Sequence, residues 1–378
     1  MRITPLLTSL VLTLALPESP SAFGQELPSR IPIRMLSAQD EIDDYVRREM
    51  DSQHIPGLAL AVVRAGKIVQ TKSYGRANLE LEAPVTASTL FGLGSISKQF
   101  TAAAIMLLVE DQKLRIDDPI SKYFSWMSNQ WGGVTIRHLL THTSGIREEE
   151  WKGGLVEFDR FEYEQEDVVR TAFGPLLSPP GARFEYRNVG YRLLGMLIEK
   201  ASGQAYWDFL AQRIFRPLGM NSTRNSDPKT VIPSRARGYA WSEGRWVNRE
   251  PVTASSAFSE GALVSSTLDM VKWDIALNSE TLLRRESLEA MWAPFQLNDG
   301  TLSKYGFGWF LRPIDGHRTV GHGGGLPGFS TFIWRFIDDQ ITVIVLTNSE
   351  TADTIQIALH VAGLHVPTLL SPSIKKQL

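Results

Sequence analysis

Two residues at the start of an apolar segment have the types and the spacing of a serine nucleophile and its base. Ser95 and Lys98 form the pattern S-x-x-K. Because one helical turn separates them, a helix that begins near Ser95 places both side chains on one face, beside its positive N-terminus. An amine that burial keeps neutral can take the proton of a weakly nucleophilic serine hydroxyl. The segment that follows has apolar residues at the spacing of a buried helix face: Phe100, Ala103, Ala104, Leu107 and Leu108.

The S-x-x-K motif alone does not distinguish a nucleophile from a helix cap. Two further matches, 226–229 and 373–376, occur in a polar loop and at the end of the chain, and neither begins an apolar helix. Ser95 can therefore be a catalytic serine or an ordinary N-cap. Other parts of the chain have to decide between these interpretations.

A tyrosine and an asparagine two residues apart form a second candidate. Tyr186 and Asn188 follow the turn at 179–181 and precede an apolar segment, 191–198. A phenol can relay protons and an amide can bind a substrate carbonyl, so the pair fits a site that handles acyl groups. The alternative is an N-cap asparagine beside a packed tyrosine.

A glycine-rich stretch between two predicted strands is the third candidate. Residues 321–328 read GHGGGLPG. Glycines let a substrate approach the strand backbone, whose N–H groups can complete an oxyanion hole with that of Ser95. The alternative is a glycine-rich hairpin turn. A G-x-G-x-x-G match in this stretch precedes a predicted strand rather than a helix, so a dinucleotide site is not supported.

The N-terminal part of the chain predicts the start of an α/β body. An amphipathic helix near residues 38–50 is followed by two segments rich in Val, Ile, Ala and Leu, 58–64 and 67–74. These are joined at 65–66 by Ala-Gly and predict a β-hairpin. The Ser95 helix comes next.

The C-terminal part returns to strands after a helical, loop-rich middle at about 114–239. Strands are predicted at 317–320, 330–337 and 341–347, and a helix at about 355–364 follows. The sheet therefore draws on both ends of the chain, and the middle is an insertion. An acidic patch within this insertion, 148–150 and 162–167, is interpreted as a solvated surface.

Composition excludes several classes of protein. The chain of 378 residues is 43% hydrophobic and 21% charged, as globular proteins are. A net charge of -2 and a pI near 6.4 give no electrostatic footprint for nucleic acid or an anionic membrane. Cysteine is absent, which excludes disulfides, cysteine nucleophiles and thiolate metal sites.

Two other site types are not supported by the sequence. His138 and His142 have the i, i+4 spacing of zinc ligands, but no glutamate follows His138 as in H-E-x-x-H, so we interpret both as structural. The nucleophile pattern G-x-S-x-G of α/β-hydrolases does not occur.

The N-terminus has the layout of a secretory signal peptide. Arg2 precedes an apolar run at 3–16, and small residues at 22 and 24 allow a cut before Gln25. The run is short for a membrane span, although an uncleaved anchor is the alternative. We expect a periplasmic or secreted protein that has no stable membrane insertion after cleavage.

The three candidates, in this order and with these wide gaps, resemble the motifs of the penicillin-recognising serine hydrolases. The tyrosine in the second motif indicates the class C β-lactamase side of that superfamily, with its D,D-peptidases and family VIII carboxylesterases. The segments 137–146, 217–220 and 305–309 resemble this group too, so the likeness extends from about residue 38 to about 365. It implies an α/β (α+β) fold in which helices flank an antiparallel sheet, with an all-helical subdomain.

The resemblance also implies a role for each motif residue. Ser95 would form an acyl-enzyme, and Lys98 and Tyr186 would share the proton transfers. Asn188 would bind the substrate's acyl-side amide or lie in the hydrogen-bond network. The backbone N–H groups of Ser95 and Gly325 would form the oxyanion hole. No metal or organic cofactor is implied.

The third motif departs from the lactamase pattern. His322, Gly323 and Gly324 stand where lactamases have lysine, threonine and glycine, whose lysine and threonine help bind the substrate's carboxylate. Histidine is mostly neutral above pH 7 at its ordinary pKa, and glycine has no hydroxyl. These substrate-binding residues therefore favour esters or small amides over β-lactams, while some relatives with H-x-G act on D-amino-acid peptides.

We therefore predict a secreted serine hydrolase that acts through an acyl-enzyme on an ester or small amide. Its expected partner is a small-molecule substrate (an ester, β-lactam or D-peptide) and not a nucleic acid. A D-amino-acid peptidase or weak β-lactamase is one alternative, and a non-catalytic penicillin-binding or peptidoglycan-sensing module is another. The oligomeric state stays open. The predicted parts are a signal peptide (1–24), a hydrolase domain (25–366, with an α/β body at about 38–110 and 255–366 and a helical insertion at about 111–254) and a C-terminal tail (367–378).

Overall fold

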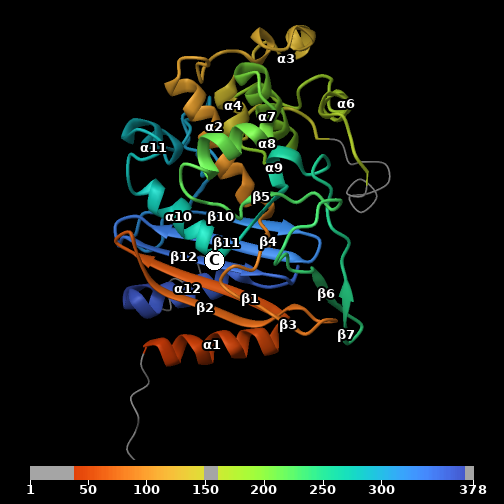
Figure 1. Ribbon diagram of the computed structural model, residues 1–378. Helices are drawn as coiled ribbons and strands as arrows, with labels where there is room; N and C mark the ends of the chain where they lie inside the picture. Colours follow the sequence, from red (N-terminus) through yellow and green to blue (C-terminus); the bar gives the residue numbers. More distant parts are fainter. Residues whose placement is uncertain (1–37, 149–160, 371–378) are drawn as a thin grey trace, which may run out of the picture. The chain divides into compact units, whose positions relative to one another are not determined.

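The central feature of the computed structural model is a seven-stranded antiparallel sheet with the strand order β3-β2-β1-β12-β11-β10-β9 (Figure 1). The structure describes residues 38–148 and 161–370. Because β1 pairs with β12, strands from the two ends of this part of the chain meet in the middle of the sheet, as predicted. The strands are β1 (Gly57–Arg64), β2 (Lys67–Asn78), β3 (Ala83–Pro84), β9 (Phe310–Leu311), β10 (Thr319–Leu326), β11 (Phe329–Phe336) and β12 (Ile341–Thr347).

The predicted hairpin of β1 and β2 turns where the sequence indicates. Ala65 and Gly66 have φ values of 47° and 72°, the left-handed backbone that a tight two-residue turn requires. Strand β1 is buried on both faces, so its side chains alternate between two hydrophobic clusters rather than between core and solvent. The apolar run of β1 follows from this central place in the sheet.

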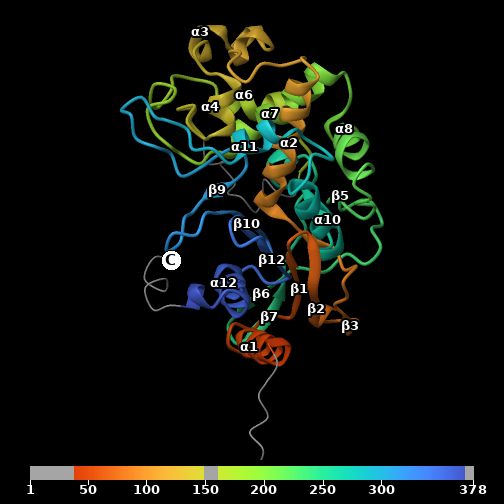
Figure 2. The same cartoon turned by 90° about the vertical axis from the view of Figure 1, so that its left-hand side faces the viewer.

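Helices cover both faces of the sheet, as Figure 2 also shows. Side chains from one face of β1, such as Leu60, pack with helices α1 (Ala38–Ser52) and α12 (Thr354–His365). Side chains from the other face, such as Ala61, pack in the cluster that includes α2 (Ser97–Glu110) and α10 (Thr267–Leu277). This second cluster continues from the sheet into the helical region above it in Figure 1, so sheet and helices share one core.

The helical region contains short strands as well as helices. Strand β5 (Arg224–Asn225) joins β4 (Phe91–Gly92) and β8 (Leu263–Ser265) in a small sheet, and β6 (Tyr239–Ser242) pairs with β7 (Arg245–Asn248). Strands this short leave no periodic pattern, which is why they are absent from the prediction for 111–254. The remaining helices are η1 (Gly94–Ile96), η2 (Ile120–Lys122), η3 (Ser125–Met127), α3 (Ser128–Trp131), α4 (Ile136–Leu140), α6 (Gln165–Thr171), α7 (Asn188–Ser202), α8 (Tyr206–Leu210), η4 (Ala211–Phe215), α9 (Phe258–Gly261), α11 (Arg285–Met291) and η5 (Pro367–Leu370).

The glycine-rich stretch is mostly strand rather than turn. Strand β10 continues through its glycines to Leu326, and the chain turns at Pro327 and Gly328, where φ of Gly328 is 78°. Strand β9 pairs only with Val320 and Gly321 of β10. Beyond these two residues, no described strand pairs with the outer edge of β10.

The predicted signal peptide, 1–24, and the tail beyond 370 lie outside the described residues. Within 38–148 and 161–370, no helix has the length and apolar character needed to cross a membrane.

Candidate active site

Ser95 and Lys98 lie together at the start of the buried helix. Ser95 belongs to η1, which leads directly into α2, and neither helix has a side-chain N-cap hydrogen bond. The Nζ atom of Lys98 donates a hydrogen bond to Ser95 Oγ at 3.1 Å. Ser95 is therefore placed against an amine and does not act as a helix cap.

Lys98 is completely buried and bonded on three sides. Besides Ser95 Oγ, its Nζ donates to Asn188 Oδ1 and to the backbone carbonyl of Glu260, both at 2.9 Å. The ring centroid of Tyr186 lies 4.9 Å from the same nitrogen. A buried amine needs such acceptors, and here they also hold it beside the serine.

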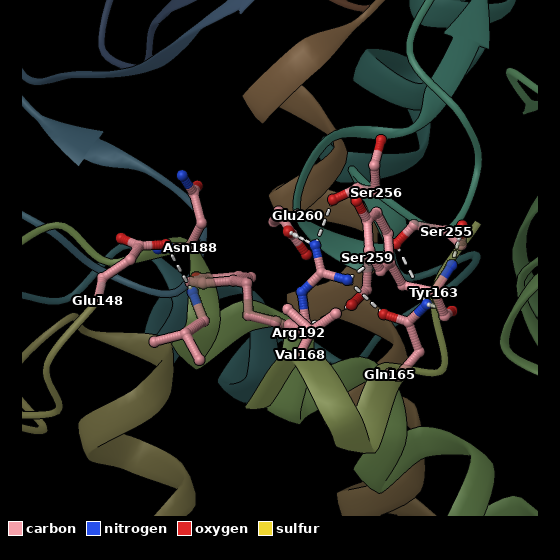
Figure 3. A network of polar contacts seen from close by, with 12 residues as sticks. Glu148, Tyr163, Gln165, Val168, Asn188, Arg192, Ser255, Ser256, Ser259 and Glu260 are labelled. Atoms are coloured by element: carbon pink, nitrogen blue, oxygen red, sulfur yellow. Dashed lines mark hydrogen bonds and ion pairs between the residues drawn. The ribbon is translucent and has the colours of Figure 1, made fainter. Parts of the chain in front are cut away.

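Asn188 is the first residue of α7, and its side chain comes from the helical region. Since its Oδ1 accepts from Lys98, its Nδ2 is left to donate to a substrate carbonyl. The helix start is capped from outside: the Glu148 carboxylate accepts from the backbone N–H of Asn188 at 2.9 Å and of Val189 at 3.1 Å (Figure 3). Glu148, predicted to be part of a solvated patch, is half-buried and in addition stabilises the positive end of α7. The acidic residues at 162, 164, 166 and 167 are exposed, as predicted, and residues 149 and 150 lie outside the described residues.

Tyr186 presents a hydroxyl without a protein partner. Its ring stacks on Phe310 with an angle of 9° between the planes and lies 4.2 Å from the His142 ring. The buried hydroxyl makes no hydrogen bond to any described residue. It can therefore bond to a substrate or a water molecule beside Lys98, as a proton relay requires.

Glycines bring the Ser95 turn against strand β10. A Cβ atom on Gly94, whose φ is 53°, would lie 2.7 Å from the backbone nitrogen of Gly325. A Cβ atom on Gly324 would lie 1.8 Å from the carbonyl oxygen of Leu93. Only glycine allows this contact, which brings the backbone of Gly325 close to the turn that contains Ser95.

His322 is buried, and both of its ring nitrogens bond within the protein. Nδ1 lies 2.6 Å from the carbonyl oxygen of Gly323, which can only accept, so Nδ1 carries the proton. Nε2 then accepts from the Tyr305 hydroxyl at 2.9 Å. Burial, with a smaller contribution from the charge of Lys98, lowers the pKa of His322 to about 3. The imidazole is neutral at physiological pH and offers no N–H to a substrate.

The two histidines with zinc-ligand spacing have structural partners. His138 Nδ1 accepts from the backbone N–H of Thr135 at 3.2 Å in a capping box at the start of α4. His142 Nδ1 accepts from the backbone N–H of Arg187 at 3.1 Å and so supports the segment before Asn188. Burial holds the pKa of His142 well below its usual value. No group of side chains within 38–148 and 161–370 could hold a metal ion.

Four residues that support this site were not predicted to belong to it, although Tyr305 begins the segment 305–309 and Glu148 lies in the acidic patch. Glu148 caps α7, Tyr305 holds His322, and Arg192 and Glu260 form an ion pair beside Lys98. Arg192 left one signal, a charged residue inside an apolar helix four positions after Asn188. The other three act through contacts between segments far apart in the chain, which local patterns do not contain.

Comparison with known proteins identifies the family. A model of the family described as Beta-lactamase matches residues 42–364. The chain belongs to the β-lactamase family. Penicillin-binding protein 4* of Bacillus subtilis (strain 168) is 35% identical over 82% of this chain and 72% of its own length.

Two further relatives of this β-lactamase family member have names that mention D-amino acids. A D-aminopeptidase of Brucella ovis is 28% identical over 82% of this chain and 60% of its own length. The crystal structure of a D-amino acid amidase from Ochrobactrum anthropi SV3 has a TM-score of 0.73 and 27% identity over 88% of this chain and 98% of its own. The predictions of a β-lactamase-like fold and of a serine hydrolase are confirmed.

Proposed function

We propose that this family member hydrolyses small amides and esters through an acyl-enzyme on Ser95, in the periplasm or outside the cell. The strongest support is the fully buried Lys98, whose Nζ lies 3.1 Å from Ser95 Oγ. To act as the base, Lys98 must be a neutral amine, which still donates to Asn188 and Glu260 and turns its lone pair toward Ser95 Oγ to take the hydroxyl proton as Ser95 attacks. The proposed location depends only on the predicted signal peptide.

The arrangement supports each step of acyl transfer. Ser95 Oγ attacks the carbonyl carbon, and its proton passes to Lys98. The N–H groups of Ser95 and Gly325 bind the negative oxygen that forms. Lys98 then returns this proton through the Tyr186 hydroxyl, which makes no hydrogen bond to any described residue, to the leaving group as its bond to the carbonyl carbon breaks, so Lys98 and Tyr186 regain their starting states. Water then attacks the acyl-enzyme by the same steps in reverse order, and Asn188 Nδ2 binds the acyl-side carbonyl throughout.

The substrates that fit best are amides and esters of D-amino acids with a neutral leaving group. The names of the D-aminopeptidase and the D-amino acid amidase support the D-amino-acid part of this proposal. His322 supports the neutral leaving group, because both of its ring nitrogens bond to protein atoms and its pKa is lowered to about 3. A neutral imidazole without a free N–H cannot replace the lactamase lysine as a partner for a carboxylate.

One observation favours a second candidate, a D-peptidase or weak β-lactamase whose substrate has an anionic end. Arg312 follows β9, and its guanidinium carbon lies 5.0 Å from the centroid of the Phe310 ring, which stacks on Tyr186. Burial lowers the pKa of Arg312, although the side chain stays charged. A substrate carboxylate near Phe310 would meet this charge rather than His322.

A panel of four substrates tests the proposal with the wild type and Ser95→Ala. The panel contains p-nitrophenyl acetate, D-alanine p-nitroanilide, D-alanyl-D-alanine and a chromogenic cephalosporin. We expect turnover of the ester and the nitroanilide, an acyl adduct on Ser95 by intact mass, and neither with Ser95→Ala. A wild type that hydrolyses none of the four and takes no fluorophosphonate label would contradict the proposal and support a non-catalytic module.

Arg312→Met separates the two substrate candidates. If Arg312 binds an anionic end, the substitution lowers kcat/KM about tenfold for the dipeptide and the cephalosporin and leaves the neutral nitroanilide unchanged. If Arg312→Met hydrolyses each of the four substrates at the wild-type rate, Arg312 has no role in substrate binding.

A further inference from the structure

Besides Ser95, two acceptors hold Lys98, and a buried ion pair joins the elements that supply these two. Asn188 begins helix α7, and Arg192 lies one turn further along the same helix. Glu260, whose carbonyl accepts from Lys98, lies in α9. The Arg192 guanidinium donates to the Glu260 carboxylate, and both side chains are almost completely buried, with exposed fractions of 3% and 9% (Figure 3).

Arg192 also holds the segment that leads into α9. Its guanidinium donates to the carbonyl oxygens of Ser255 and Ser256, with 2.8 Å for Ser255, and to the Gln165 side chain. Figure 3 shows these acceptors around the Arg192 guanidinium. The guanidinium thus attaches the approach to α9, and α9 itself, to helix α7.

Helix α9 needs such support because it is a single turn of four residues, Phe258–Gly261. Its carbonyl groups accept hydrogen bonds from side chains of α2. Thr101 Oγ1 donates to the carbonyl of Ser259 at 2.6 Å, and Lys98 donates to that of Glu260. A one-turn helix has little stability of its own, so side-chain contacts determine where these carbonyls lie.

We propose that the Arg192–Glu260 ion pair positions Lys98 for proton exchange with Ser95. The pair fixes α9 to α7 and so keeps the two acceptors of Lys98, the Glu260 carbonyl and Asn188 Oδ1, in place relative to each other. Arg192 and Glu260 are positioning residues, since neither side chain bonds to Ser95 or Lys98 in the contacts described. This inference depends on the proposed function, because it assigns the ion pair a role in the hydrolysis at Ser95. A misplacement of about 1 Å at a reacting group can reduce the rate about 10²-fold.

A second buried ion pair in the same protein provides a matched control. Arg335 of β11 donates to Asp274 of α10 at 2.7 Å, and the two side chains have exposed fractions of 2% and 0%. Its other partners are Asn278 and Thr342, which do not bond to Ser95 or Lys98. Both are buried arginine–carboxylate pairs. The Arg192–Glu260 pair joins the elements that supply acceptors to Lys98, whereas the Arg335–Asp274 pair joins β11 to α10.

The experiment compares two double variants, Arg192→Met/Glu260→Leu and Arg335→Met/Asp274→Leu. Replacing both partners leaves no unpaired buried charge, so we expect each variant to fold. The readouts are kcat and KM for p-nitrophenyl acetate, the rate of fluorophosphonate labelling of Ser95, and the melting temperature. We expect the first variant to lose about 10²-fold in kcat and in labelling rate, with KM near the wild-type value.

The control variant should keep the wild-type kcat and labelling rate at temperatures where it is folded. A first variant that melts like the control and retains wild-type kcat would overturn the inference and leave the pair a purely structural role. If the first variant does not fold, Glu260→Gln replaces it, because the amide oxygen can still accept from Arg192. A smaller loss of kcat without a change in KM is then expected, and an unchanged kcat overturns the inference.

Failure of the inference and failure of the proposed function give different results. If the proposed function is wrong, the wild type itself neither hydrolyses the ester nor takes the label. If only the inference is wrong, the wild type does both, and the Arg192–Glu260 variant does so equally fast.

Discussion

Lys98 and His322 are two basic side chains of one active site that are buried in different ways. Lys98 donates to three oxygen atoms, from Ser95, Asn188 and Glu260. His322 bonds to the Gly323 carbonyl and the Tyr305 hydroxyl and otherwise lies among aromatic rings. Oxygen acceptors allow an amine to exchange protons in a buried place, whereas aromatic surroundings favour a neutral imidazole.

The two sides of the site therefore differ in their proposed roles. In the proposed mechanism, the side built from α2, α7 and α9 holds the groups that form and break bonds. The side built from β9 and β10 has the neutral ring of His322 where the lactamase motif has a lysine, and the guanidinium of Arg312 lies over the nearby Phe310 ring. Under the proposed function, the reaction type therefore depends on the first side and the substrate preference on the second.

Lys98→Met should have the largest effect and test the first side directly. The variant keeps most of the side-chain volume but removes the base, so kcat/KM should fall about 10³-fold, within the range for general-base catalysis. The measurement is hydrolysis of p-nitrophenyl acetate by protein that circular dichroism shows to be folded. A loss smaller than about tenfold would mean that another group takes the Ser95 proton.

Gly94→Ala should have the next largest effect, because Gly94 lies where the two sides meet. The new Cβ would lie 2.7 Å from the Gly325 nitrogen, and the φ of 53° disfavours any side chain. Displacing one oxyanion donor lowers kcat about 10²-fold. Gly300→Ala is the control. Its φ is 86° and no atom lies within 4 Å of the new Cβ, so this substitution causes backbone strain without a steric clash. If both variants have the same kcat, the close approach at Gly94 is not needed for the oxyanion hole.

The sequence predicted the parts of the site that depend on local spacing. Ser95 and Lys98 are one turn apart on one helix, so their proximity follows from helix geometry. The hairpin turn at Ala65 and Gly66 likewise follows from residue type. The glycine stretch at 321–326 could not be identified as strand with the same ease, because glycine has no side chain to show the alternation of a strand.

The remaining parts depend on contacts that no local pattern contains. The cap on α7 joins Glu148 to Asn188, 40 positions away, and the ion pair joins Arg192 to Glu260, 68 positions away. The neutral state of His322 depends on burial, with a smaller contribution from the charge of Lys98, so its residue type alone indicated only the ordinary pKa. Motif residues were therefore predictable, and the residues that hold them were not.

Tyr186→Phe should lower kcat about 10²-fold without a loss of stability, because the hydroxyl has no hydrogen-bond partner among the residues that the structure describes. Tyr305→Phe is the matched control on the other side of the site. Its hydroxyl donates to His322 at 2.9 Å, so its removal should cost about 1–3 kcal/mol of unfolding free energy and affect kcat less. Urea unfolding and ester hydrolysis of both variants measure the two effects. If Tyr186→Phe loses stability and keeps kcat, the hydroxyl is structural.

The smallest effect concerns the pH dependence that His322 contributes. Its pKa is about 3 in the folded protein and about 6.5 in an unfolded chain, so between these values the unfolded chain binds a proton that the folded protein does not. Its contribution to stability is therefore complete above about pH 6.5 and is lost as the pH falls toward 3. Urea unfolding at pH 7.5 and pH 5 should show a smaller difference between the wild type and His322→Asn at the lower pH. A pH-independent difference, or an imidazole that titrates near pH 6.5 by ¹⁵N NMR, would show that His322 can be charged and can bind a substrate carboxylate after all.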